Sequence, residues 1–140
     1  MQFQDSKNLE IYCDGGARGN PGPAASAFIA KSNKGEVIYQ EKKFIGRATN
    51  NVAEYSGVLM ALTWLSNQNL SAVIFLDSEL VGRQLRGEYK IKNKNLLDYV
   101  LKIKDLEKRM AGKIVYKNIP RSLNHEADLL VNKALDAEKF

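Results

Sequence analysis

The feature that most restricts the fold of this chain is a short strand pattern leading directly into a glycine- and proline-rich stretch. Residues 9–13 (LEIYC) combine apolar, β-branched and aromatic side chains, which is typical of a β-strand. Asp14 follows, and residues 15–23 (GGARGNPGP) then predict a tight turn. We therefore expect Asp14 at a strand end, beside free backbone N–H groups. An isolated Asp-Gly pair is also a common hairpin signal, so this stretch indicates a site only if other carboxylates lie near it.

The composition is typical of a globular protein and excludes a membrane-spanning one. The length of 140 residues suits one domain over residues 1–140, and no apolar run approaches the ~18 residues that cross a bilayer. The first residues lack a signal-peptide pattern and Cys13 is the only cysteine, so we expect a cytoplasmic location and a buried, unreactive thiol. The net charge of +5 favours a polyanionic partner without identifying it.

The rest of the chain predicts an α/β fold. The expected elements are strands at residues 24–30 and 36–45, a helix following residues 47–51, a strand at 72–76, helices at 78–86 and 96–110, a strand at 113–119 and a helix at 124–137. Short turns make the first three strands antiparallel, whereas helical crossovers make the fourth and fifth parallel to the first. We therefore expect a mixed five-stranded sheet with helices on its faces. If the fourth strand lies beside the first, Asp14 and Asp77 meet at the ligand-binding edge of that sheet.

Four acidic residues lie where predicted elements begin or end: Asp14, Glu54, Asp77 and Asp128. Each of the last three has an ordinary structural alternative. Glu54 has capping-box spacing with Asn51, Asp77 has a position suited to capping the next helix, and Asp128 is suited to a solvated first turn. If the four converge instead, their charges repel unless cations neutralise them.

The chemistry of such a cluster is restricted by its ligand atoms. Carboxylate oxygens without histidine or cysteine clusters suit Mg²⁺ or Mn²⁺ and exclude a zinc site of the usual type. Two such ions about 4 Å apart can activate water at a phosphodiester and stabilise the leaving oxygen. The residues alone thus indicate metal-dependent phosphoryl chemistry.

Four segments in this order resemble type 1 ribonuclease H: IYCDGGARGNPGP, ATNNVAEYSGVLMAL, FLDSELV and IPRSLNHEADLLVNKAL. The resemblance covers nearly the whole chain and implies the sheet order 3-2-1-4-5. It also implies that Asp14, Glu54, Asp77 and Asp128 are the catalytic acids, which hold two Mg²⁺ ions, with Mn²⁺ as the alternative. The implied reaction is hydrolysis of the RNA strand of an RNA·DNA hybrid, leaving 3′-hydroxyl and 5′-phosphate ends.

The same resemblance implies a set of substrate contacts. The RNA strand would meet Gly15, Ala17, Asn20 and Ser78 in the minor groove, where 2′-hydroxyls distinguish RNA from DNA. Asn50 and Asn51 would straddle the two strands in the same groove, and Arg47 and Thr49 would bind a phosphate of the DNA strand.

The chain departs from the family pattern in three places. Where many bacterial members carry a basic protrusion, only residues 87–95 remain; the lysines at 90, 92 and 94 suit either phosphate contact or a solvated surface. Glu79 adds a carboxylate where an uncharged side chain is frequent. The family's loop histidine has no match. We therefore expect Arg121 to act in its place on phosphate, with His125 as the competing candidate.

The expected function is that of an independent, monomeric enzyme acting on RNA·DNA hybrids, without a membrane or an obligate protein partner. Three alternatives remain open: a non-catalytic hybrid-binding module, a nuclease for double-stranded RNA, and a domain derived from a reverse transcriptase. Presence of all four acids argues against the non-catalytic module.

Overall fold

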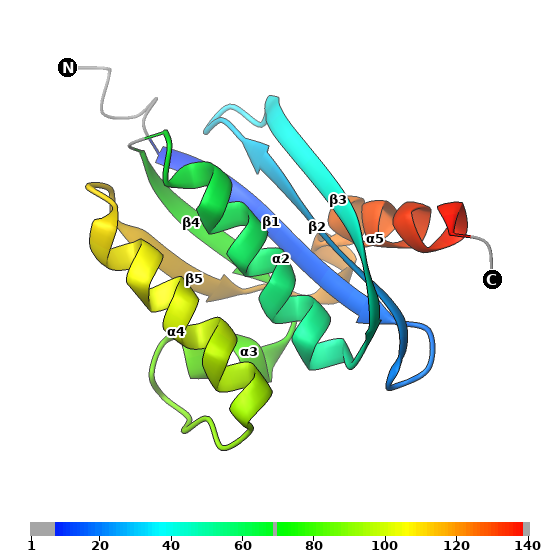
Figure 1. Cartoon of the computed structure of the whole chain (residues 1–140). Helices are drawn as coiled ribbons and strands as arrows, with labels where there is room; N and C mark the ends of the chain where they lie inside the picture. The colour runs from blue at the N-terminus through cyan, green and yellow to red at the C-terminus, as the bar shows by residue number, and fades with distance from the viewer. Residues whose placement is uncertain (1–7, 69, 139–140) are drawn as a thin grey trace.

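The computed structural model describes residues 8–68 and 70–138, which fold around a five-stranded sheet (Figure 1). The elements in chain order are β1 (Asn8–Ala17), β2 (Gly22–Lys31), β3 (Val37–Ala48), α2 (Asn50–Leu65), β4 (Ser71–Leu76), α3 (Glu79–Leu85), α4 (Lys94–Arg109), β5 (Ile114–Asn118), a short 3₁₀ turn (Arg121–Leu123) and α5 (His125–Ala137). The strand order is β3-β2-β1-β4-β5. β1 pairs antiparallel with β2 and parallel with β4, and this confirms the predicted sheet.

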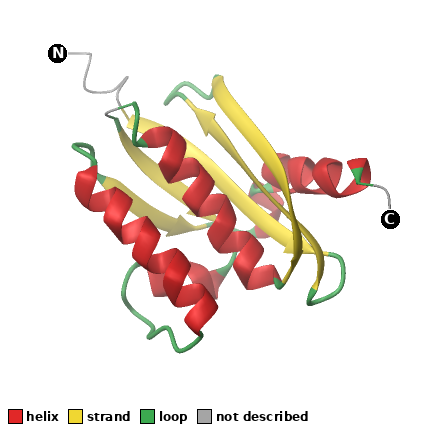
Figure 2. Ribbon diagram, in the orientation of Figure 1, coloured by secondary structure: helices red, strands yellow, loops and turns green. Residues whose placement is uncertain are grey.

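Helices cover both faces of the sheet, with α2 and α4 on one side and α5 on the other (Figure 2). Alternating side chains of β2 contribute to both layers. Phe28 and Ala30 belong to the larger core cluster with α2 and α4, whereas Ala27 and Ile29 pack in the cluster that includes α5. This alternation follows from the two-residue period of a strand, and it makes the middle of the sheet buried on both faces.

β1 continues past Asp14, so the predicted strand end at this residue is wrong. β1 pairs with β2 as far as Ala17, and the chain turns only at residues 18–21. The parallel pairing with β4 ends earlier, at Tyr12. Asp14 therefore lies within a strand on its β2 side and beyond the last paired residue on its β4 side. This leaves space for a second carboxylate beside it.

Glycine is required in β1 by close packing and not by a turn. A Cβ atom built on Gly15 would lie 2.1 Å from the carbonyl oxygen of Ala53 in α2. The glycines that the sequence suggests for turning instead let the helix approach the strand.

Among the described residues, no helix is long and apolar enough to cross a bilayer. Cys13 is buried in β1, as expected for a structural thiol. The cytoplasmic location and the single domain over residues 1–140 stay predictions.

Candidate active site

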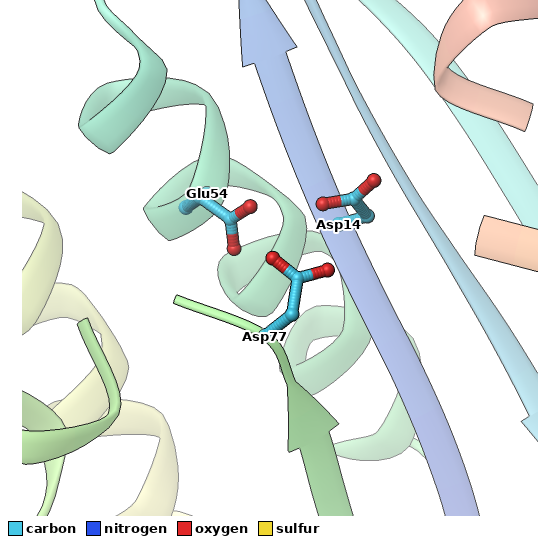
Figure 3. A group of neighbouring side chains, drawn as sticks. All are labelled: Asp14, Glu54 and Asp77. Atoms are coloured by element: carbon cyan, nitrogen blue, oxygen red, sulfur yellow. The ribbon is translucent and has the colours of Figure 1, made fainter. Parts of the chain in front are cut away.

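Three carboxylates from separate elements converge at the end of the β1–β4 pairing. Asp14 comes from β1, Glu54 from α2 and Asp77 from the residue after β4, and their side chains point toward one another in Figure 3. One oxygen from each lies within 4.8 Å of the others. Asp14 and Glu54 are only 6% and 5% exposed. The predicted meeting of Asp14 and Asp77 is confirmed, and Glu54 joins them.

Close packing of α2 on β1 brings Glu54 to this point. A Cβ on Gly57 would lie 2.7 Å from the carbonyl oxygen of Asp14. The buried hydroxyl of Ser26 donates a 2.7 Å hydrogen bond to the carbonyl of Ala53, which ties β2 to the same turn of the helix. Because the backbones are so close, the N–H of Gly15 reaches Glu54 Oε1 at 3.4 Å.

Neither Glu54 nor Asp77 caps a helix, which excludes the structural alternative for both. The N-cap of α2 is Thr49, whose hydroxyl accepts from the N–H of Val52 at 3.2 Å, so the predicted capping box beginning at Asn51 is wrong. Ser78 caps α3 by accepting from the N–H of Val81 at 3.2 Å. Because hydroxyl groups accept the hydrogen bonds of the N–H groups at both helix starts, both carboxylates are available to the site.

Asparagines hold the backbone and the carboxylate of Asp77. Asn118, the last residue of β5, donates from Nδ2 to the carbonyl oxygens of Leu76 at 3.3 Å and Ser78 at 2.8 Å. Asn124 donates from Nδ2 to Asp77 Oδ2 at 3.0 Å. The position of Asp77 is thus fixed from both sides of the residue.

Burial raises the pKa values of the two inner carboxyls. The pKa of Asp14 rises to about 6, chiefly through burial, with the charge of Asp77 adding and a hydrogen bond with Glu54 opposing. Burial and then the charge of Asp14 hold the pKa of Glu54 well above its usual range. Within the described residues, Glu54 Oε2 is buried and has no hydrogen-bond partner. An unpaired buried carboxylate oxygen among other hard oxygen donors fits a divalent cation such as Mg²⁺.

The fourth predicted acid stands slightly apart from the other three. Asp128 lies in the first turn of α5 and is partly buried, and it is outside the closest group. It lines the same hollow of about 480 Å³. The hollow is also lined by these predicted residues: Asp14, Glu54, Asp77, Gly15, Ala17, Asn50, Asn51, Ser78 and Arg121.

The turn after β1 is bonded directly to the start of α2. Asn50 Oδ1 accepts from the N–H of Ala17 at 2.8 Å, and the N–H of Asn50 donates to Asn20 Oδ1 at 3.0 Å. Arg47 and Thr49 line a separate hollow of about 410 Å³ with Asn95, Asp98, Tyr99, Lys102 and others. The predicted substrate residues therefore form one group at the acids and another beside α4.

Comparisons with known proteins agree with this fold and site. The family model described as reverse transcriptase-like matches residues 12–134. "Bifunctional protein Rv2228c" of Mycobacterium tuberculosis is 40% identical over 129 residues, covering 91% of this chain and 35% of that protein. Ribonuclease HI of Halobacterium salinarum is 35% identical over 129 residues, covering 91% and 64%. The structure of LC11-RNase H1 in complex with an RNA/DNA hybrid superposes with a TM-score of 0.88 at 38% identity, covering 91% and 96%.

The chain belongs to the type 1 ribonuclease H family. It covers 35% of the length of the mycobacterial relative, so this ribonuclease H domain corresponds to one part of that protein.

The departures from the family pattern have defined positions in this ribonuclease H domain. Arg121 is exposed and lines the hollow of the acids, whereas His125 is exposed at the start of α5 and is not among the lining residues. Glu79 is paired with Arg83, whose Nη2 lies 2.9 Å from Glu79 Oε1. The connection lysines, Lys90, Lys92 and Lys94, are all exposed. The roles of Arg121 and of these lysines stay predictions.

The two asparagines that hold Asp77, Asn118 and Asn124, are missed by sequence reasoning. Asn124 precedes α5, where asparagine usually caps a helix, but its side chain makes no capping bond. It donates instead to the carbonyl of Cys13 and to Asp77, and it is 1% exposed. No spacing signal distinguishes this use from a cap, because the contact joins residues far apart in the chain.

Proposed function

We propose that this ribonuclease H domain is a metal-dependent endoribonuclease that hydrolyses the RNA strand of RNA·DNA hybrids, leaving 3′-hydroxyl and 5′-phosphate ends. The observation that carries this proposal is the convergence of Asp14, Glu54 and Asp77 within 4.8 Å, with a buried Glu54 oxygen that lacks a partner in the described part of the chain. Family membership and the hybrid complex of LC11-RNase H1 support the choice of substrate.

The four acids would hold two Mg²⁺ ions, with Mn²⁺ as a substitute. Asp14, Glu54 and Asp77 supply the close group, and Asp128 supplies a carboxylate at the edge of the same hollow. Bound ions of this kind activate water and stabilise the leaving oxygen of a phosphodiester. The chain itself orients the ligands: the Gly15 N–H holds one oxygen of Glu54, and the second oxygen remains for coordination.

Recognition of the RNA strand would come from the joined turn and helix. Asn50 Oδ1 is occupied by the N–H of Ala17, and this leaves its NH₂ group to donate to acceptors in the minor groove. The bond from Asn50 to Asn20 keeps the turn fixed against α2. A rigid surface at the minor groove suits reading of 2′-hydroxyls, which mark the RNA strand.

Recognition of the DNA strand would come from the hollow that contains Arg47 and Thr49. It also contains Lys102, so two cationic groups and a hydroxyl are available to bind a phosphate, against the single carboxylate of Asp98. Arg121 would contact the scissile phosphate or the product from the hollow of the acids. Its guanidinium can bind phosphate but cannot accept a proton.

The test uses four end-labelled substrates of one sequence: RNA·DNA hybrid, double-stranded RNA, double-stranded DNA and single-stranded RNA. In Mg²⁺ or Mn²⁺ we expect cleavage of the hybrid's RNA strand alone. The products should carry 5′-phosphate ends, which are identified by the removal of that phosphate on phosphatase treatment. Preferential cleavage of double-stranded RNA would favour the alternative nuclease, and binding without cleavage would favour the non-catalytic module. Sedimentation of the purified chain tests the expected monomer.

A further inference from the structure

A buried asparagine next to the acids has bonds that do not follow from its place at a helix start. Asn124 occupies the N-cap position of α5, but with φ −110° and ψ 22° it makes no side-chain cap. Its side chain is 1% exposed. An ordinary capping asparagine bonds the N–H groups of its own helix. Asn124 bonds two other elements instead.

The orientation of its amide is fixed by its partners. Nδ2 donates to the carbonyl oxygen of Cys13 at 2.8 Å and to Asp77 Oδ2 at 3.0 Å. A carbonyl and a carboxylate accept hydrogen bonds, so only the NH₂ side of the amide can face them. Oδ1 is buried with no partner among the described residues. Leaving an acceptor unpaired is costly, which argues that the two donated bonds outweigh that cost at this position.

Asn124 is linked to the positions of three acids at once. It bonds the carboxylate of Asp77 directly, and Cys13 immediately precedes Asp14 in β1. Its own carbonyl accepts from the N–H of Asp128 at 3.1 Å in the first turn of α5. Carboxylates that converge repel one another, so a donor on Asp77 and a fixed α5 oppose their separation.

We propose that Asn124 is a positioning residue that holds Asp77 and the start of α5 in place for metal binding. The inference rests on the proposed metal-dependent function. Groups that hydrogen-bond to metal ligands orient those ligands, and their removal typically lowers metal affinity or activity by about 10–100-fold. Asn124 itself need not contact the cation or the substrate.

The test compares Asn124→Ala with Tyr116→Phe in the complete chain. Tyr116 is also buried, and its hydroxyl donates to Glu107, away from the acids, so the control removes a partly buried hydrogen bond without touching them. We expect Asn124→Ala to weaken Mn²⁺ binding to the substrate-free protein, measured by calorimetry, by about tenfold or more. The Mg²⁺ concentration for half-maximal hybrid cleavage should rise in parallel, with little change in KM for the hybrid. Tyr116→Phe should change neither quantity.

The outcomes separate this inference from the function on which it rests. Circular dichroism checks that each variant is folded. If Asn124→Ala is unfolded, Asn124→Ser is tested in its place, with the same expected loss of Mn²⁺ affinity. The serine hydroxyl supplies one donor, whereas the asparagine amide supplies two. Wild-type Mn²⁺ affinity in a folded Asn124 variant, or an equal loss in Tyr116→Phe, would overturn the positioning role while leaving the nuclease intact. A wild-type protein that neither binds Mn²⁺ nor cleaves hybrid would overturn both.

Discussion

The close approach of Gly57 to β1 predicts that Gly57→Ala changes the stability and the activity of the protein for different reasons. Gly57 lies in the middle of α2, where replacement of glycine by alanine should by itself stabilise a helix by about 1 kcal/mol. A Cβ there would lie 2.7 Å from the carbonyl oxygen of Asp14, whereas ordinary contact begins at 3.4 Å. The helix and the strand must therefore separate by about 0.7 Å at this point.

This displacement acts at the acids, because Glu54 and Gly57 share one turn of α2. Overpacking of this kind costs about 1–3 kcal/mol, so we expect Gly57→Ala to be neutral or destabilised by up to about 2 kcal/mol despite the better helix propensity. Misplacement of catalytic groups by about 1 Å costs up to about 100-fold in rate. We therefore expect kcat/KM for hybrid cleavage to fall by about 10–100-fold.

The assay pairs thermal unfolding without metal with hybrid cleavage at saturating Mg²⁺. Thr63→Ala is the matched control, since it also improves helix propensity in α2 but lies at an exposed position. The control should keep full activity. A Gly57→Ala protein that is about 1 kcal/mol more stable than wild type and equally active would refute the close-packing argument.

Three further predictions concern charge. Changing all three connection lysines to alanine should weaken hybrid binding and reduce the salt slope by about 0.9 for each phosphate that the variant no longer neutralises, and an unchanged slope would identify a solvated surface. Arg121→Ala should lower the steady-state rate by about tenfold, equal to about 1.4 kcal/mol. A rate loss confined to His125→Ala, in which the pH–rate profile loses its limb near about 6.5, would assign the role in catalysis to His125 instead. Asp14 has a folded-state pKa of about 6 against 3.8, so its protonated form contributes stability that is present below about pH 4 and is lost as the pH rises through 6. Metal-free protein should thus lose about 2 kcal/mol from this group between pH 4 and 7, and the loss should be absent in Asp14→Asn.

Much of the fold follows from local pattern in the sequence. The short loop at residues 32–36 forces β2 and β3 to be antiparallel, and the apolar run at residues 72–76 of β4 requires cover on both faces. α3 ends within one residue of the prediction, just before Gly87 with its φ of +80°. α4 begins at Lys94, two residues before the predicted start, because Asn93 caps it through the N–H groups of Asn95 and Leu96. These signals act over a few residues, so the sequence displays them directly.

The details of the site depend on contacts between distant residues and are predicted less well. The glycines after Asp14 suggest a turn, but Gly15 is required by the approach of α2. Thr49 and Asn51 are both good capping residues, and the choice of Thr49 frees Glu54 for the acids. Asn124 has the position of a helix cap, but its side chain donates hydrogen bonds to Cys13 and Asp77, which are far from it in the sequence. In each case, a local rule offers two uses and the packing of another element decides between them.

The most direct test of the account is hybrid cleavage by Asp14→Asn, measured beside its Mn²⁺ affinity, hybrid affinity and thermal stability. The substitution removes a carboxylate charge at the buried centre of the acid cluster and changes little volume. We predict that cleavage and Mn²⁺ binding are lost, while hybrid affinity stays near that of the wild type and metal-free stability at pH 7 is retained or increased. Cleavage at the wild-type rate by the folded variant would contradict the metal-dependent mechanism.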